Sequence, residues 1–251
     1  MEKKRPAPRR VQVIRKKKVS PHMLRITLGG DELADFPTER ESGYIKLRVG
    51  EPTPNSDDQP VVRTYTVRHF DSAAKELDVD FVLHDVSGPA ADWARGCAAG
   101  DTIQFGGPGP TKLVDFTADW FLLVGDMSAL PAIGANIERL PRDARGTALI
   151  EIIHPDDRQD IEIPEALNVQ WIVNPHPDVE NSVLLDAVKA LPWLPGRPSI
   201  WVAGEFSQSL AIRKFLKAER QFERNQMYAS SYWQIGMTED GHRVSKAQVT
   251  D

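Results

Sequence analysis

The sequence changes its pattern near residue 113, and this change constrains the fold more than any other feature. Before it, short runs rich in Val, Ile, Thr, Tyr and Phe are separated by turn-forming clusters such as GEPTPNSDDQP (50–60). From residue 118 on, apolar strand-like runs alternate with segments whose apolar residues recur at helical spacing. The first pattern predicts antiparallel β structure, and the second predicts a parallel sheet with helices on its faces.

We therefore predict two domains, residues 1–113 and residues 118–251. The first is expected to be a six-stranded antiparallel β-barrel, and the second a parallel α/β domain of the nucleotide-binding type. The six runs expected to form the barrel are 10–19, 22–30, 44–50, 63–70, 76–84 and 101–109, with one helix at 88–96. The second domain is expected to contain strands at 119–126, 147–154, 168–174, 199–205 and 226–233, with helices at 128–140, 182–191 and 208–220.

Composition excludes several classes of protein. The apolar runs are too short to span a bilayer and no apolar leader is seen, so we expect a cytoplasmic protein without a membrane span. The single cysteine, Cys97, excludes an intramolecular disulfide and a four-cysteine iron–sulfur cluster, and the six His residues are scattered, so no metal site is predicted. Redox chemistry in this chain would therefore need an organic cofactor. Nothing in the sequence requires more than a monomer.

The first 18 residues carry nine Lys or Arg and one Glu, although the net charge of the chain is −5. They can be read as a basic arm for an anionic ligand, or as a solvated terminus that runs into a first strand with a basic outer face. We favour the second interpretation because no aromatic residue interleaves the charges. The acidic remainder of the chain argues against nucleic acid as a partner.

The stretch RTYTVRHF (63–70) carries the first chemical signal. In a strand, Arg63 and Tyr65 point to the same face. Arg is suited to phosphate oxygens and Tyr to stacking on a flat ring, so the pair suits a ligand that has both. Thr66 could reach a ring nitrogen of such a ligand. The alternative is an ordinary surface Arg beside a core Tyr.

A second signal follows in FVLHDVSGPAADWARG (81–96). Gly88 and Pro89 are typical of a helix start, where unpaired N–H groups attract an anion. His84 ends the preceding strand, and Trp93 on the helix can equally be explained by core packing.

A third signal is the strand–turn–helix FLLVGDMSALPAIGANIERL (121–140), together with WVAGE (201–205). Parallel sheets bind nucleotides at the carboxyl ends of such strands. No G-x-G-x-x-G motif is present, so the loop lacks the Rossmann fingerprint.

These segments, with GDTIQFGGPGP (100–110) and SYWQIGMTED (231–240), resemble the siderophore-interacting proteins over about residues 10–243. That family consists of flavin-dependent ferric-siderophore reductases within the ferredoxin–NADP reductase-like superfamily. The resemblance implies FAD on the barrel and NADH or NADPH, or else a ferredoxin, as electron donor. Electrons would pass through FAD to chelated Fe(III), and iron would leave the ferric siderophore as Fe(II).

The resemblance also assigns residues. It implies FAD contacts at Arg63, Thr64, Tyr65, Thr66, Val67, His84, Val86, Gly88, Pro89, Ala90, Ala91 and Trp93, with Thr66 the one candidate for a catalytic side chain beyond the flavin. It implies NAD(P)H contacts at Gly125, Asp126, Ser128, Ala129, Gly204 and Glu205. It implies siderophore contacts at Lys46, with Lys112 and Arg243 as weaker candidates.

The chain departs from the family pattern at two places. Met127 and Ser128 stand where the family commonly has Glu-Thr, and Gln234 stands where a basic residue often follows Tyr-Trp. Two other functions therefore stay open at this point: another NAD(P)H–flavin or ferredoxin-type reductase, and a non-catalytic siderophore-binding protein. The choice between NADH and NADPH also stays open; Arg158 and His154 follow the second strand of the α/β domain, where a 2′-phosphate could be read.

Overall fold

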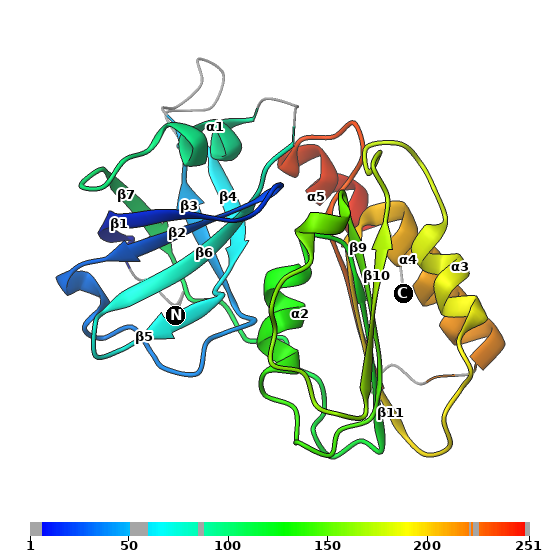
Figure 1. Ribbon diagram of the computed structural model, residues 1–251. Helices are drawn as coiled ribbons and strands as arrows, with labels where there is room; N and C mark the ends of the chain where they lie inside the picture. Colours follow the sequence, from blue (N-terminus) through cyan, green and yellow to red (C-terminus); the bar gives the residue numbers. More distant parts are fainter. Residues whose placement is uncertain (1–6, 51–59, 85–87, 221, 223–225, 249–251) are drawn as a thin grey trace, which may run out of the picture. The chain divides into compact units, whose positions relative to one another are not determined.

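The computed structural model describes residues 7–50, 60–84, 88–220, 222 and 226–248 (Figure 1). The chain divides into two compact units, residues 1–112 and residues 113–251. The first is an antiparallel β-sheet unit and the second a parallel α/β unit, so the predicted fold class is confirmed.

The N-terminal unit is one sheet in the order β4-β3-β7-β1-β2-β6-β5. Its elements are β1 (Arg9–Ser20), β2 (Met23–Gly29), β3 (Tyr44–Arg48), β4 (Val62–Thr66), β5 (His69–Asp71), β6 (Glu76–Val82), α1 (Pro89–Gly96) and β7 (Thr102–Gly106), with a short 3₁₀ helix at Asp31–Leu33. Apolar side chains alternate inward along these strands, as in β3, where Ile45 and Leu47 are buried and Lys46 is exposed.

The run 63–70 is not one strand, as the sequence predicts, but two. β4 and β5 lie at opposite ends of the sheet order, and the chain crosses between them at Val67 and Arg68. Val67 donates its N–H to Gly43 O (2.9 Å), whereas Arg68 donates its N–H to Asp78 O (3.0 Å) in β6. Two residues therefore join the first and last strands of the sheet order, and the sheet has seven strands where the sequence predicts six.

The C-terminal unit is a five-stranded parallel sheet in the order β10-β9-β8-β11-β12. Its elements are β8 (Trp120–Gly125), α2 (Leu130–Ile137), β9 (Gly146–Ile152), β10 (Leu167–Val173), α3 (Val183–Ala190), β11 (Pro198–Glu205), α4 (Phe206–Arg220), β12 (Met227–Trp233) and α5 (Glu239–Gln248), with a 3₁₀ helix at Pro155–Asp157. α2 covers one face of the sheet, and α3 and α4 cover the other (Figure 1).

The sequence of this unit contains almost continuous apolar runs, and the central strands explain why. Every residue of β8 and of β11 is buried, because helices cover both faces of the sheet. The strand order reverses between β8 and β11, so the loops at their carboxyl ends diverge. Ligands of open α/β sheets bind at such a switch point.

Candidate functional site

Strand β4 brings the Arg63–Thr66 motif to the end of the barrel sheet. Tyr65 is paired with Ile45 of β3, and Arg63 is paired with Leu47, so both share the face of those core residues. Both side chains are nevertheless half-buried, and Thr64 is exposed on the opposite face. Arg63 Nη1 donates to its neighbour's carbonyl, Val62 O (2.9 Å). The strand therefore presents a guanidinium and a phenol at the rim of the core.

Three aromatic rings connect this strand to helix α1. The rings of Tyr65 and Phe81 have centroids 4.3 Å apart, and those of Phe81 and Trp93 are 5.7 Å apart. Trp93 is half-buried and packs against the barrel core, as the packing interpretation of that residue expects. The contacts fix α1 beside the strand that carries Arg63 and Tyr65.

The N-terminus of α1 is open to an anion. Gly88 is the N-cap, Pro89 occupies the first turn, and no side chain in the described part of the chain caps the helix. A Cβ at Gly88 would meet no atom of the described residues within 4 Å. The N–H groups of Ala90 and Ala91 belong to this uncapped turn, although both side chains are buried. These features fit a phosphate group.

The other end of α1 is held by a residue of the basic N-terminal segment. Lys16 Nζ donates to Arg95 O and Cys97 O (both 2.8 Å) and to Ala94 O (3.4 Å), the last carbonyls of the helix. A cation at this end opposes the helix dipole. Arg15, the preceding residue, forms an ion pair with Glu76 (2.7 Å). These contacts support the interpretation of this segment as part of the barrel.

Other predicted flavin contacts have plainer surroundings. Val67 is fully buried, and its N–H and C=O bond Gly43 and Ser42, so it closes the barrel rather than lining a surface. His84 is exposed, and its carbonyl accepts a hydrogen bond from Arg95. Val86 lies outside the described residues.

In the C-terminal unit, the carboxylate of Asp126 joins three strand ends. Oδ1 accepts from Ser128 N (2.9 Å), Ser128 Oγ (2.5 Å) and Ala129 N (3.3 Å). Oδ2 accepts from Glu205 N (2.8 Å) and Trp233 Nε1 (2.7 Å). A carboxylate has about four acceptor positions, so protein donors occupy all of them.

Gly204 makes this junction possible. It has φ +143°, and a Cβ there would lie 2.6 Å from Asp126 Oδ2, so only glycine fits. Gly125 is similarly crowded, because its Cβ would lie 2.6 Å from Ala203 O. The two predicted glycines thus let β8 and β11 end against one carboxylate.

Two further buried carboxylates lie at the same edge. Glu205 Oε2 accepts from Gln208 N (3.0 Å), and Glu151 accepts from Gln208 Nε2 (3.1 Å) and from Asn174 Nδ2 (2.8 Å). Burial raises the pKa of Glu151, and the nearby Asp126 and Glu205 carboxylates raise it further. This edge of the sheet is therefore strongly acidic.

The three cations predicted to contact a siderophore lie in different settings. Lys46 is exposed on the outer face of β3, opposite Thr64 of β4. Lys112 is half-buried, and its carbonyl accepts from Ser42 Oγ (2.8 Å). Arg243 on α5 is exposed and lies 3.7 Å from Asp240.

Several of these groups were not found from the sequence. Lys16 and Trp233 have partners about 80 to 107 positions away along the chain, which no local pattern reveals. The amide oxygen of Gln234, one of the two departures from the family pattern, is buried without a hydrogen-bond partner in the described part of the chain. Glu151 gave a signal that could have been used: it is a charged residue inside the apolar run TALIEIIH.

Two absences hold for the residues that the structure describes. No group of three or more His, Cys, Asp or Glu side chains is placed to hold a metal ion. No described helix combines the length and the apolar character needed to cross a membrane.

Comparisons with known proteins agree with this architecture. The model of the siderophore-interacting FAD-binding domain matches residues 12–56 and 48–112, and the siderophore-interacting protein model matches residues 118–236. The chain is 35% identical to the ferric vibriobactin reductase ViuB of Vibrio cholerae, over 100% of this chain and 98% of that protein.

Solved structures are similar as well. The siderophore-interacting protein SipS from Aeromonas hydrophila superposes with a TM-score of 0.84 at 32% identity, covering 96% of each chain. The ferredoxin–NADP⁺ reductase of Plasmodium falciparum superposes with a TM-score of 0.66 at 12% identity, covering 90% of this chain and 96% of that one. The second similarity is one of fold.

Proposed function

This chain belongs to the siderophore-interacting protein family, and from that premise we propose that it is an FAD-dependent ferric-siderophore reductase. It takes electrons from NADH or NADPH and delivers them to chelated Fe(III). Fe(II) binds the hard oxygen ligands of a siderophore far more weakly than Fe(III), so reduction releases the metal. No protein ligand for iron is needed, because iron is here the cargo of the substrate.

One observation carries the proposal: the ring contacts Tyr65–Phe81–Trp93 hold the Arg-x-Tyr-Thr strand beside an uncapped helix N-terminus. A guanidinium, a phenol and unpaired N–H groups in one compact unit suit a ligand with a diphosphate and a flat ring. FAD has both groups, and the donor set fits it.

We assign the FAD contacts to residues 1–113. Arg63 and the first turn of α1, from Gly88 to Ala91, would hold the diphosphate. Tyr65 would offer its ring for stacking, and Thr66 its hydroxyl for a hydrogen bond to the flavin. Lys16 would act at a distance, by fixing the helix whose N-terminus meets the phosphate.

We assign the nicotinamide donor to residues 118–251. Gly125, Ser128, Ala129 and Gly204 would approach it at the carboxyl ends of β8 and β11. Asp126 has its acceptor positions occupied by protein donors, so it would position these loops rather than bind the ligand.

The chemistry of the reaction belongs to the cofactor. When bound, FAD supplies the ability to take two electrons as a hydride from a nicotinamide and to release them singly to Fe(III). The residues assigned above would bind and orient the ring. Lys46, exposed on the outer face of β3, would attract siderophores that carry negative charge.

The test starts from the protein as purified. FAD is released and quantified, NADH or NADPH is added without oxygen, and a ferric siderophore is then added with a ferrous trap. We expect FAD in the protein, loss of the flavin absorbance with a nicotinamide donor, and trapped Fe(II). A protein that contains no flavin would refute the proposal, and a flavoprotein reduced only by a reduced ferredoxin would refute the assigned donor.

The variant Arg63→Ala tests the assigned diphosphate contact. Charge-assisted hydrogen bonds contribute about 1.5–3 kcal/mol, so we expect FAD affinity to fall roughly 10- to 100-fold. Arg48→Ala is the matched control, because Arg48 lies on the neighbouring strand, is exposed, and bonds Gln104 (3.2 Å). Equal FAD affinity in the two variants would remove Arg63 from the site.

A further inference from the structure

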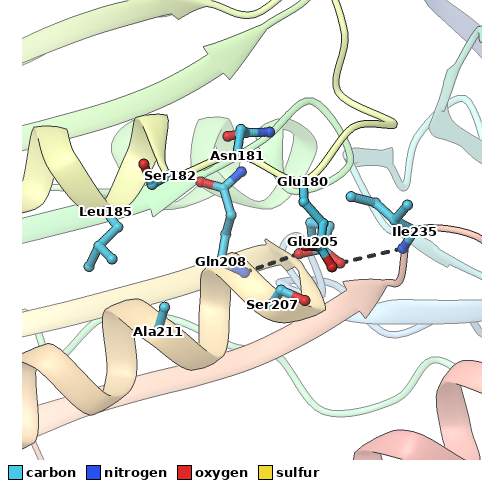
Figure 2. Close-up of a pocket in the computed structure, with 9 residues that line it drawn as sticks. All are labelled: Glu180, Asn181, Ser182, Leu185, Glu205, Ser207, Gln208, Ala211 and Ile235. Carbon is cyan, nitrogen blue, oxygen red and sulfur yellow. Dashed lines mark hydrogen bonds between the residues drawn. The ribbon is translucent and has the colours of Figure 1, made fainter.

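A pocket of about 370 Å³ opens beside the carboxyl end of β11, within the C-terminal unit (Figure 2). Glu180, Asn181 and Ser182 line it from the segment that leads into α3. Glu205, Gln208 and Ile235 line it from the end of β11, from α4 and from the segment after β12. It therefore lies at the sheet edge where open α/β proteins bind nucleotides.

The lining of this pocket is acidic. Glu180 and Glu205 are carboxylates, and none of the residues that line the pocket is Lys, Arg or His. Glu205 is buried and fixed, because it accepts from Gln208 N (3.0 Å) and Ile235 N (3.4 Å), as Figure 2 shows. Glu180 is exposed, so its carboxylate can accept hydrogen bonds from a ligand.

Charges behind the lining reinforce this character. Gln208 connects the pocket wall to the buried Glu151 (3.1 Å), and Asp126 bonds the main chain of Glu205 (2.8 Å). A multiply charged anion in the pocket would meet the field of several carboxylates in a partly buried setting, where screening is weak. An anionic ferric siderophore is disfavoured there for the same reason.

The sequence places His154 and Arg158 where they could contact a 2′-phosphate, but neither residue lines the pocket. His154 caps the 3₁₀ turn after β9, where its Nδ1 accepts from Asp156 N (3.2 Å). Arg158 follows that turn as its C-cap. As far as the structure describes the chain, the pocket walls thus contain acceptors for hydroxyl groups and no cation for a phosphate.

We propose that this pocket receives the adenosine ribose of the donor and selects NADH over NADPH, with Glu180 as the specificity-determining side chain. The inference rests on the proposed function, since it concerns the donor of that reaction. A ribose diol can donate both hydroxyl protons to a carboxylate. A 2′-phosphate removes one of these donors and adds about two negative charges, so NADPH loses a hydrogen bond and is repelled.

The kinetic test compares flavin reduction by NADH and by NADPH in the purified holoprotein. We expect kcat/KM to favour NADH by about tenfold or more. Glu180→Gln should reduce this preference several-fold, mainly through the two KM values, and Glu180→Arg should reduce it further. Glu165→Gln is the matched control, because Glu165 is exposed just before β10, at the amino edge of the same sheet.

A binding test separates this inference from the proposed function. Titration of the same holoprotein with 5′-AMP and with its 2′-phosphorylated form requires no electron transfer. We expect 5′-AMP to bind more tightly, and Glu180→Gln to narrow the difference. Flavin reduction that favours NADPH, an unchanged preference in Glu180→Gln, or no binding of either nucleotide would each overturn the inference. The first two of these results would leave the reductase function intact.

Discussion

Replacement of Asp126 by Asn should destabilise the C-terminal unit, because this carboxylate accepts hydrogen bonds at the ends of three strands. An Asn amide has one oxygen and one NH₂ group, so it can serve only one side of the junction. If the NH₂ group replaces Oδ2, the N–H groups of Glu205 and Trp233 lose their acceptor. If the amide is flipped, the main-chain N–H group of Ser128 loses its acceptor, whereas that of Ala129 keeps a hydrogen bond to Asp126 O (3.0 Å).

The first orientation therefore leaves two buried or half-buried donors unsatisfied, and the flipped orientation leaves one. Each such donor costs about 1–3 kcal/mol, so the free energy of unfolding should fall by about 2–6 kcal/mol in the first orientation and by about 1–3 kcal/mol in the flipped one. The flipped orientation costs less and sets the expected loss, because it affects one donor only and Ser128 is half-buried, so water can reach it.

Urea unfolding followed by tryptophan fluorescence measures this effect, since five of the six Trp residues lie between positions 113 and 251. Asp143→Asn is the matched control, because Asp143 is an exposed carboxylate of the same unit. A loss below about 1 kcal/mol, within the usual range of a surface substitution, would refute the reasoning. A raised KM for the donor at unchanged stability would instead show direct contact with the ligand.

Three other predictions concern the cations and the C-terminal helix. Lys46→Ala should raise the KM for a catecholate siderophore with little effect on FAD content, and an unchanged KM would remove Lys46 from the substrate site. Lys16→Met should lower FAD affinity and reduce the free energy of unfolding by about 1 kcal/mol, because the last carbonyls of α1 lose their hydrogen-bond donor. Lys17→Met on the same strand is the control. Equal FAD affinity in the two variants would contradict the proposed role of Lys16. Burial lowers the pKa of His242, whose Nε2 lies 2.7 Å from Ser231 Oγ, so the unfolded state takes up a proton more readily. The free energy of unfolding should then be highest above about pH 6.5 and fall below it. His242→Gln should reduce this dependence on pH, as measured by urea titrations at several pH values.

The sequence predicted those parts of the fold that local periodicity controls. The apolar runs of β8 and β11 and the Gly-Pro start of α1 lie where the pattern places them. The split of residues 63–70 was missed because the alternating pattern continues through Val67 and Arg68. Closure there depends on hydrogen bonds to Gly43 and Asp78, which the local sequence does not specify.

Helix α5 was missed for a related reason. Its sequence, EDGHRVSKAQ, contains a glycine and few apolar residues, so its intrinsic helix preference is weak. The helix is held by tertiary contacts: His242 is buried against Ser231, and Lys246 Nζ donates to Ser231 O (2.8 Å) and Ser230 Oγ (2.7 Å). Packing rather than propensity makes this segment helical.

One part of the acidic sheet edge could be predicted from the sequence and another part could not. A Glu inside a strand covered on both faces cannot reach water, so the position of Glu151 alone requires buried partners. The identity of those partners is a property of the topology, because Asn174 and Gln208 are 23 and 57 positions away. Since Gln208 also forms the pocket wall, the network that satisfies one buried carboxylate sets the charge that a donor nucleotide would meet. The proposed preference for NADH would then depend on residues at three strand ends rather than on one fingerprint loop.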